Sequence, residues 1–156
     1  MRLSKNPNLN LTYTPLKGLF AARKESEISI KEVSEAVKHI RNSKLPDPDK
    51  LKNAGSFFKN PIVSDKKAKK LQEKYPNMPK YQQDSEKSKL AAGWLIEQCG
   101  WKGKRVGDVG VYEKQALVIV NYDNASGEQI LSLANDIKKS VKKRFGVKLE
   151  PEVNII

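Results

Sequence analysis

The chain has a single cysteine and a single histidine among its 156 residues. Cys99 has no partner for an internal disulfide, which fits a protein kept in a reducing compartment. One cysteine and one histidine cannot make a zinc site, because such sites take three or four ligands mostly of these two types. We therefore expect no metal site. We also expect no histidine-activated nucleophile, because nothing around His39 supports that role.

Long apolar segments are also missing. The longest apolar run covers residues 116–120, far too few to cross a bilayer. The first seven residues lack the apolar stretch of a secretion signal. These two observations predict a cytoplasmic protein that does not enter a membrane.

Arginine is scarce although the chain is strongly basic. The net charge is +12, yet only five of the thirty cationic side chains are arginine. Arginine is the usual reader of base edges and stacks better than lysine. The lysines are spread widely, with pairs at 66–67, 69–70, 138–139 and 142–143 on predicted helix faces, where such runs are usually solvated. We therefore expect no nucleic-acid partner, and a steep dependence of binding on salt would contradict this expectation.

Periodicity and capping signals predict an alternation of helices and strands. Ser29 with Glu32, and Ser126 with Gln129, have the spacing of capping boxes. In chain order we expect a strand at 9–13, a turn or short helix at 15–24, a helix from 30 to about 42, a strand at 53–61, a helix from 65 to about 75, a polar loop at 81–88, a helix at 89–99, a glycine-rich loop at 101–110, a strand at 114–121, a helix from 127 to about 145 and a strand at 147–153. This order predicts an α+β fold, with a small mixed sheet covered by helices.

The segment at residues 53–61, NAGSFFKNP, is the best candidate for a site. It places a hydroxyl, an ammonium and an amide around Phe57 and Phe58, and Gly55 permits an unusual backbone conformation. Taken alone, Ser56 is an ordinary strand serine, and the two phenylalanines are core residues. The residues by themselves thus predict a soluble mixed domain with a polar strand, and they indicate no reaction.

Five motifs in the same order resemble one family. They lie at residues 43–48, 53–61, 89–100, 115–118 and 149–153. From about Arg2 to Val153 the chain is similar to the C-terminal, substrate-binding portion of UDP-N-acetylenolpyruvoylglucosamine reductase, which is also called UDP-N-acetylmuramate dehydrogenase. Five motifs in one order make this resemblance specific.

The resemblance implies a reaction. Family members reduce the enolpyruvyl ether of UDP-N-acetylglucosamine to UDP-N-acetylmuramate, a peptidoglycan precursor. NADPH reduces a bound FAD, and the flavin passes a hydride to the enolpyruvyl methylene carbon. Negative charge then develops as an enolate, which must be stabilised while the neighbouring carbon is protonated.

The resemblance also implies roles for single residues. Ser56 matches the family's proton donor, and Glu152 matches the carboxylate that stabilises or protonates the enol. The residues that match positions holding the UDP moiety are Lys44, Asn60, Tyr81, Lys102 and Gln115. The family has an arginine two residues after the glutamate, where this chain has Asn154, so one cation near the substrate is in doubt.

Finally, the resemblance implies a division of the chain. Residues 1–42 would be a remnant of the preceding flavin-binding module with a connecting helix, and residues 43–156 the substrate-binding domain. We find no cofactor-binding residue in the chain, so we expect FAD to be held by a module upstream and the chain alone to be inactive. One alternative is a non-catalytic module that binds UDP-sugars or other polyphosphates. A nucleic-acid-binding protein is the other.

Overall fold

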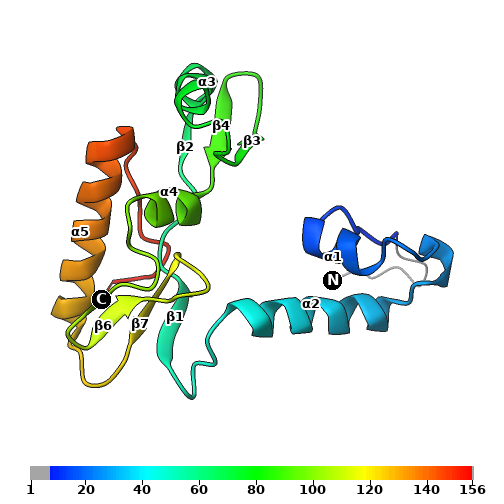
Figure 1. Cartoon of the computed structure of the whole chain (residues 1–156), viewed down its shortest axis with the longest axis horizontal. Helices are drawn as coiled ribbons and strands as arrows, with labels where there is room; N and C mark the ends of the chain where they lie inside the picture. The colour runs from blue at the N-terminus through cyan, green and yellow to red at the C-terminus, as the bar shows by residue number, and fades with distance from the viewer. Residues whose placement is uncertain (1–7, 156) are drawn as a thin grey trace. The chain divides into compact units, whose positions relative to one another are not determined.

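The computed structural model describes residues 8–155 of the chain (Figure 1). The first seven residues, on which the expectation about secretion rests, lie outside this range. The chain divides into two compact units between Lys44 and Leu45. No helix in the described part of the chain is long and apolar enough to cross a membrane. That the first unit is a remnant of another module stays a prediction.

The first unit is helical. It contains α1 (Thr14–Leu19), a 3₁₀ helix (Glu25–Glu27) and α2 (Ile30–Lys44). The predicted strand at residues 9–13 is wrong, because residues 8–12 pair with no other segment and a helix begins at Thr14. Pro15 favours this helix, since proline is well tolerated in a first turn, where its missing N–H has no partner to lose.

The start of α2 confirms the predicted capping box. The Ser29 hydroxyl accepts a hydrogen bond from the Glu32 amide at 3.2 Å, and the Glu32 carboxylate accepts one from the Ser29 amide at 2.8 Å. Arg23 donates a further bond to Glu32 at 2.5 Å. These partners, Arg23 first, lower the pKa of Glu32 from 4.5 to about 2. The helix continues two residues beyond the predicted end at Asn42.

The second unit contains a four-stranded antiparallel sheet. Its strand order is β1-β7-β6-β5, made of β1 (Lys52–Ser56), β7 (Val118–Asn121), β6 (Val109–Val111) and β5 (Arg105–Val106). Helix α5 (Gly127–Phe145) packs against β6 and β7 and lies beside the sheet in Figure 1. Its buried stripe includes Leu133, Ile137 and Val141. The predicted capping box of Ser126 and Gln129 begins this helix.

A second antiparallel sheet lies further along the same unit. Its order is β2-β4-β3, made of β2 (Ile62–Ser64), β4 (Lys87–Leu90) and β3 (Lys80–Gln82), with α3 (Asp65–Lys74) packed against β2 and β4. The α+β class is thus confirmed, with two small antiparallel sheets in place of one mixed sheet.

The hairpin of β3 and β4 corrects two expectations. The polar loop predicted at 81–88 is strand at both ends, with a turn only at 83–86, and the helix predicted from Lys89 begins later, as α4 (Ala92–Gln98). Ser88 and Leu90 are fully buried on alternate positions of β4. The alternation escaped notice because one of its two buried positions carries a hydroxyl instead of an apolar side chain.

The buried Ser88 bonds to a carboxylate that joins α3 to this sheet. Asp65, only 9% exposed, accepts a hydrogen bond from the Ser88 hydroxyl at 2.8 Å. It also pairs with Lys69 at 2.9 Å and with Lys80 at 3.3 Å. Lys69 and then Ser88 are the main causes that hold the pKa of Asp65 well below its ordinary value of 3.8.

We predict that Asp65→Asn lowers the melting temperature at pH 7. A carboxyl whose pKa is lowered by folding stabilises the fold above its unfolded pKa and loses this effect as it is protonated. The difference in melting temperature between wild type and variant should therefore shrink as the pH falls below the ordinary value of 3.8. Thermal unfolding followed by circular dichroism between pH 7 and pH 3 measures it. Asp136→Asn, which removes an exposed pair with Lys139, is the matched control. A difference that stays constant with pH would contradict the prediction.

Candidate functional site

The chain just after β1 is held between two other segments. The Phe57 amide donates to the Leu117 carbonyl at 2.8 Å, and the Phe57 carbonyl accepts from the Glu152 amide at 2.8 Å. Two residues further on, the Lys59 amide donates to the Glu150 carbonyl at 2.9 Å. Residues 57–59 therefore join the approach to β7 on one side to the C-terminal segment on the other.

The C-terminal segment is not the strand predicted at residues 147–153. It forms one isolated antiparallel bridge, between Pro151 and Phe58. Proline has no N–H to donate to a ladder, which limits how far the pairing extends. The bridge is anchored instead by side chains: Phe58 is 1% exposed and Phe57 is 6% exposed, with ring centroids 5.1 Å apart.

An irregularity in β1 precedes the two phenylalanines. The register with β7 shifts between Asn53 and Ser56. Gly55 has φ of 72°, a conformation that side chains disfavour, and its amide donates to the Asn53 side chain at 2.9 Å. After this bulge Ser56 is exposed, and Phe57 and Phe58, which follow it directly, are both buried.

The two predicted catalytic residues lie on neighbouring segments. Ser56 ends β1, and Glu152 bonds through its amide to the next residue, Phe57. Both side chains are exposed. The backbone therefore brings these two positions together although 95 residues lie between them in the sequence; their roles stay predictions.

Two of the predicted UDP-binding residues, Asn60 and Gln115, contact the first residues of α4. The Asn60 side-chain oxygen accepts a hydrogen bond from the Ala92 amide at 2.9 Å. The Gln115 side-chain oxygen accepts one from the Leu117 amide at 3.3 Å, and it would lie 3.2 Å from a Cβ placed on Gly93. Asn60 and Gln115 therefore converge on consecutive residues of α4, and both also make bonds within the fold.

The other three are spread more widely. Lys102 follows α4 and pairs with Glu97 at 2.9 Å. Tyr81 lies on β3 of the second sheet and is 58% exposed. Lys44 ends α2 in the first unit, where its ammonium lies 5.7 Å from the centroid of the Tyr13 ring. Their part in binding a ligand stays a prediction.

The glycine-rich loop does not form a cradle for a dinucleotide. A Cβ at Gly110 would lie 2.8 Å from the Lys104 carbonyl and 2.9 Å from the Tyr122 ring. Arg105 stacks on the same ring at 4.5 Å and donates to the Gly107 carbonyl at 2.7 Å. Because this hairpin closes on its own side chains, its residues do not fit a flavin.

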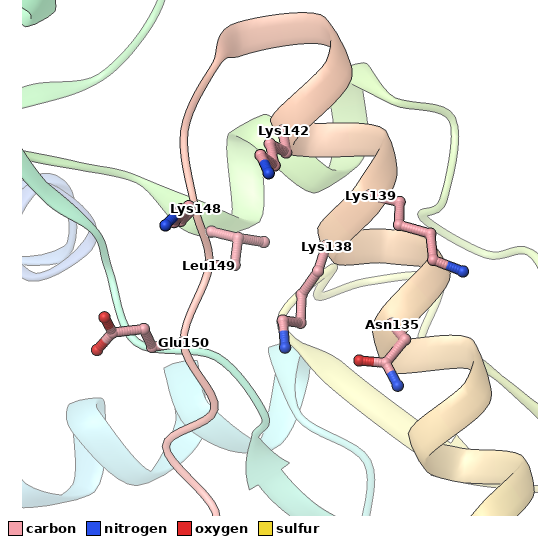
Figure 2. Close-up of a pocket in the computed structure, with 7 residues that line it drawn as sticks. All are labelled: Asn135, Lys138, Lys139, Lys142, Lys148, Leu149 and Glu150. Carbon is pink, nitrogen blue, oxygen red and sulfur yellow. The ribbon is translucent and has the colours of Figure 1, made fainter.

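Sequence patterns did not predict a groove beside α5 in the second unit, which several lysines line (Figure 2). The lysine pairs there were interpreted as solvated surface. Their helical spacing gave no signal of the groove, because its other wall is the C-terminal segment.

We predict that Asn60→Ala destabilises the second unit by about 1 kcal/mol, since it leaves the first turn of α4 without its acceptor. Ala91, which precedes the helix, offers no side-chain cap of its own. Urea unfolding measures the change. Asn60→Asp keeps the acceptor oxygen and should stay close to wild type. Equal loss in both variants would show that the bond to Ala92 is not what Asn60 supplies.

Comparison with known proteins gives a consistent result. The family model described as UDP-N-acetylenolpyruvoylglucosamine reductase, C-terminal domain, matches residues 47–156. A protein named UDP-N-acetylenolpyruvoylglucosamine reductase from Flavobacterium johnsoniae is 47% identical over 97% of this chain and 45% of its own length. One of the same name from Amoebophilus asiaticus is 49% identical over 100% of this chain and 46% of its own length. The chain thus spans about half the length of these relatives.

A solved structure is also similar in part. The crystal structure of UDP-N-acetylenolpyruvylglucosamine reductase from Thermus caldophilus aligns with a TM-score of 0.47 and 27% identity, over 84% of this chain and 36% of the other. The sequence matches carry the relationship on their own.

Proposed function

Because this chain belongs to the UDP-N-acetylenolpyruvoylglucosamine reductase family through its C-terminal domain, we propose that it forms the substrate-binding part of such an enzyme. The whole enzyme would reduce UDP-N-acetylglucosamine enolpyruvate to UDP-N-acetylmuramate for peptidoglycan synthesis in the cytoplasm. In this proposal the chain supplies the proton donor, a second catalytic carboxylate and most of the site for the UDP-sugar.

The observation that carries the proposal is the bond from the Glu152 amide to the Phe57 carbonyl. It brings an exposed carboxylate position beside an exposed hydroxyl position, Ser56, on a backbone anchored by buried rings. A serine hydroxyl is a weak acid, but it can protonate a carbanion-like centre if held within about 3 Å of it. Glu152 would stabilise the enol or return the proton.

The UDP moiety would be held by the residues around α4 together with Tyr81 and Lys44. Lysine suits a diphosphate as a point charge, and amides can bond to uracil. Lys102 would exchange its surface pair with Glu97 for a phosphate, a change of low cost because exposed pairs contribute little. Asn154 would leave the substrate with one cation fewer than in family members with arginine.

The hydride would come from outside this chain. The resemblance implies FAD reduced by NADPH, and the glycine-rich hairpin does not fit the flavin. We therefore propose that FAD is held by another part of the enzyme and that these residues act on the substrate alone.

We predict that the purified 156-residue chain is colourless and does not oxidise NADPH. Visible absorbance near the flavin bands and an NADPH assay with added FAD measure this. A yellow preparation that turns over NADPH would show that the chain holds the cofactor after all.

We predict that the chain alone binds UDP and that Lys102→Ala weakens this binding at least about fivefold, the loss of about 1 kcal/mol expected for one charged contact. Isothermal titration calorimetry measures it. Lys143→Ala, at an exposed lysine on α5 outside the predicted UDP set, is the control. UDP binding with no turnover even beside a competent flavin module would favour the non-catalytic alternative.

The proton-donor role is tested in a chimera that joins the remaining part of the Flavobacterium johnsoniae relative to this chain. Ser56→Ala should abolish transfer from reduced flavin to substrate by at least about 100-fold while flavin reduction by NADPH is unchanged. Stopped-flow absorbance separates the two half-reactions. Ser132→Ala, at an exposed serine on α5, should change neither. Equal loss in both half-reactions would exclude the assigned role.

A further inference from the structure

A groove of about 450 Å³ runs between α5 and the C-terminal segment. Its lining residues are Asn135, Lys138, Lys139, Lys142, Lys148, Leu149 and Glu150. A volume of this size is typical of a site for a small molecule. The groove shares none of its residues with the set predicted to hold the UDP moiety, so it is a separate feature of the domain.

Two lysines place their positive charges close together along this groove. Lys138 and Lys142 lie one helical turn apart on α5, and Figure 2 shows both side chains directed toward the gap beside the C-terminal segment. Asn135 extends the same face by one turn. Leu149, only 2% exposed, forms the apolar floor. The groove therefore combines two ammonium groups and an amide over a buried hydrocarbon surface.

Within the described part of the chain, the ammonium groups directed into the groove have no ion-pair partner. None of the ion pairs found among residues 8–155 involves Lys138, Lys142 or Lys148. The neighbouring Lys139 differs, because it points away from the groove in Figure 2 and pairs with Asp136 at 3.4 Å. Glu150 projects from the side of the C-terminal segment that faces away from α5. Lys138 and Lys142 therefore repel each other, and a bound anion would reduce this repulsion.

We propose that this groove binds a short polyphosphate chain, free or carried by a nucleotide. Residues four apart on a helix are separated by about 6 Å along its axis, on the order of the length of a triphosphate. Lysine ammonium groups bind phosphate as point charges. A single-stranded nucleic acid fits less well, because its bases stack on aromatic side chains and the lining has none.

The test is calorimetric titration of the chain at low salt with sodium tripolyphosphate and, separately, with ATP. The double variant Lys138→Glu/Lys142→Glu should weaken binding of both at least about tenfold, because two attractions become repulsions. The matched control is Lys66→Glu/Lys70→Glu, which reverses two exposed lysines one turn apart on α3, outside the groove. It should weaken binding by less than about threefold, as expected for screened surface charges. The probe that binds more tightly identifies the source of the phosphate chain.

Three results would overturn the proposal. One is no binding of either probe at low salt, and another is equal weakening in the groove and control variants. The third is a single-stranded oligonucleotide that binds more tightly than tripolyphosphate and loses affinity in the groove variant.

Lys102→Ala separates this site from the UDP site: it should leave tripolyphosphate binding unchanged even where it abolishes UDP binding. Lys142 is exposed and Lys138 is half-buried, so circular dichroism melting curves of the groove and control variants check that the fold is retained.

Discussion

Two backbone hydrogen bonds hold the C-terminal segment on the chain that follows β1, and the candidate site depends on them. They join Glu152 to Phe57 and Lys59 to Glu150, on either side of the bridge between Phe58 and Pro151. An exposed pairing of this length would fray. Here the buried rings of Phe57 and Phe58 hold one side, and Val147 and Leu149 on the other side are buried in the same core.

This anchoring connects the core to both proposed sites. The core cluster includes residues of α4 and α5 along with the two phenylalanines. It fixes the C-terminal segment beside Ser56, where the reaction is proposed, and beside α5, where the segment forms the second wall of the basic groove. Exposed polar positions thus lie on both sides of a segment whose alternate residues are buried.

Features decided by neighbouring residues could be predicted from the sequence, and features decided by distant ones could not. The capping boxes at Ser29 and Ser126 follow from a glutamate or glutamine three residues further on, and both are confirmed. The hairpin of β3 and β4 was missed because the buried Ser88 is polar and its partner, Asp65, lies 23 residues away in the sequence. Residues 9–13 have a composition typical of a strand, but no other described segment pairs with them. The family motifs identified candidate residues, whereas the other contacts of Asn60 and Gln115 needed the structure.

The bridge between Phe58 and Pro151 is open to direct measurement by NMR. In an antiparallel pair of this kind, flanked by hydrogen bonds and making none of its own, the two α-protons face each other closely. The account predicts a strong nuclear Overhauser effect between the α-protons of Phe58 and Pro151 and slow hydrogen exchange of the Glu152 amide. An absent cross-peak together with rapid exchange at Glu152 would contradict it, because Ser56 and Glu152 would then have no shared support.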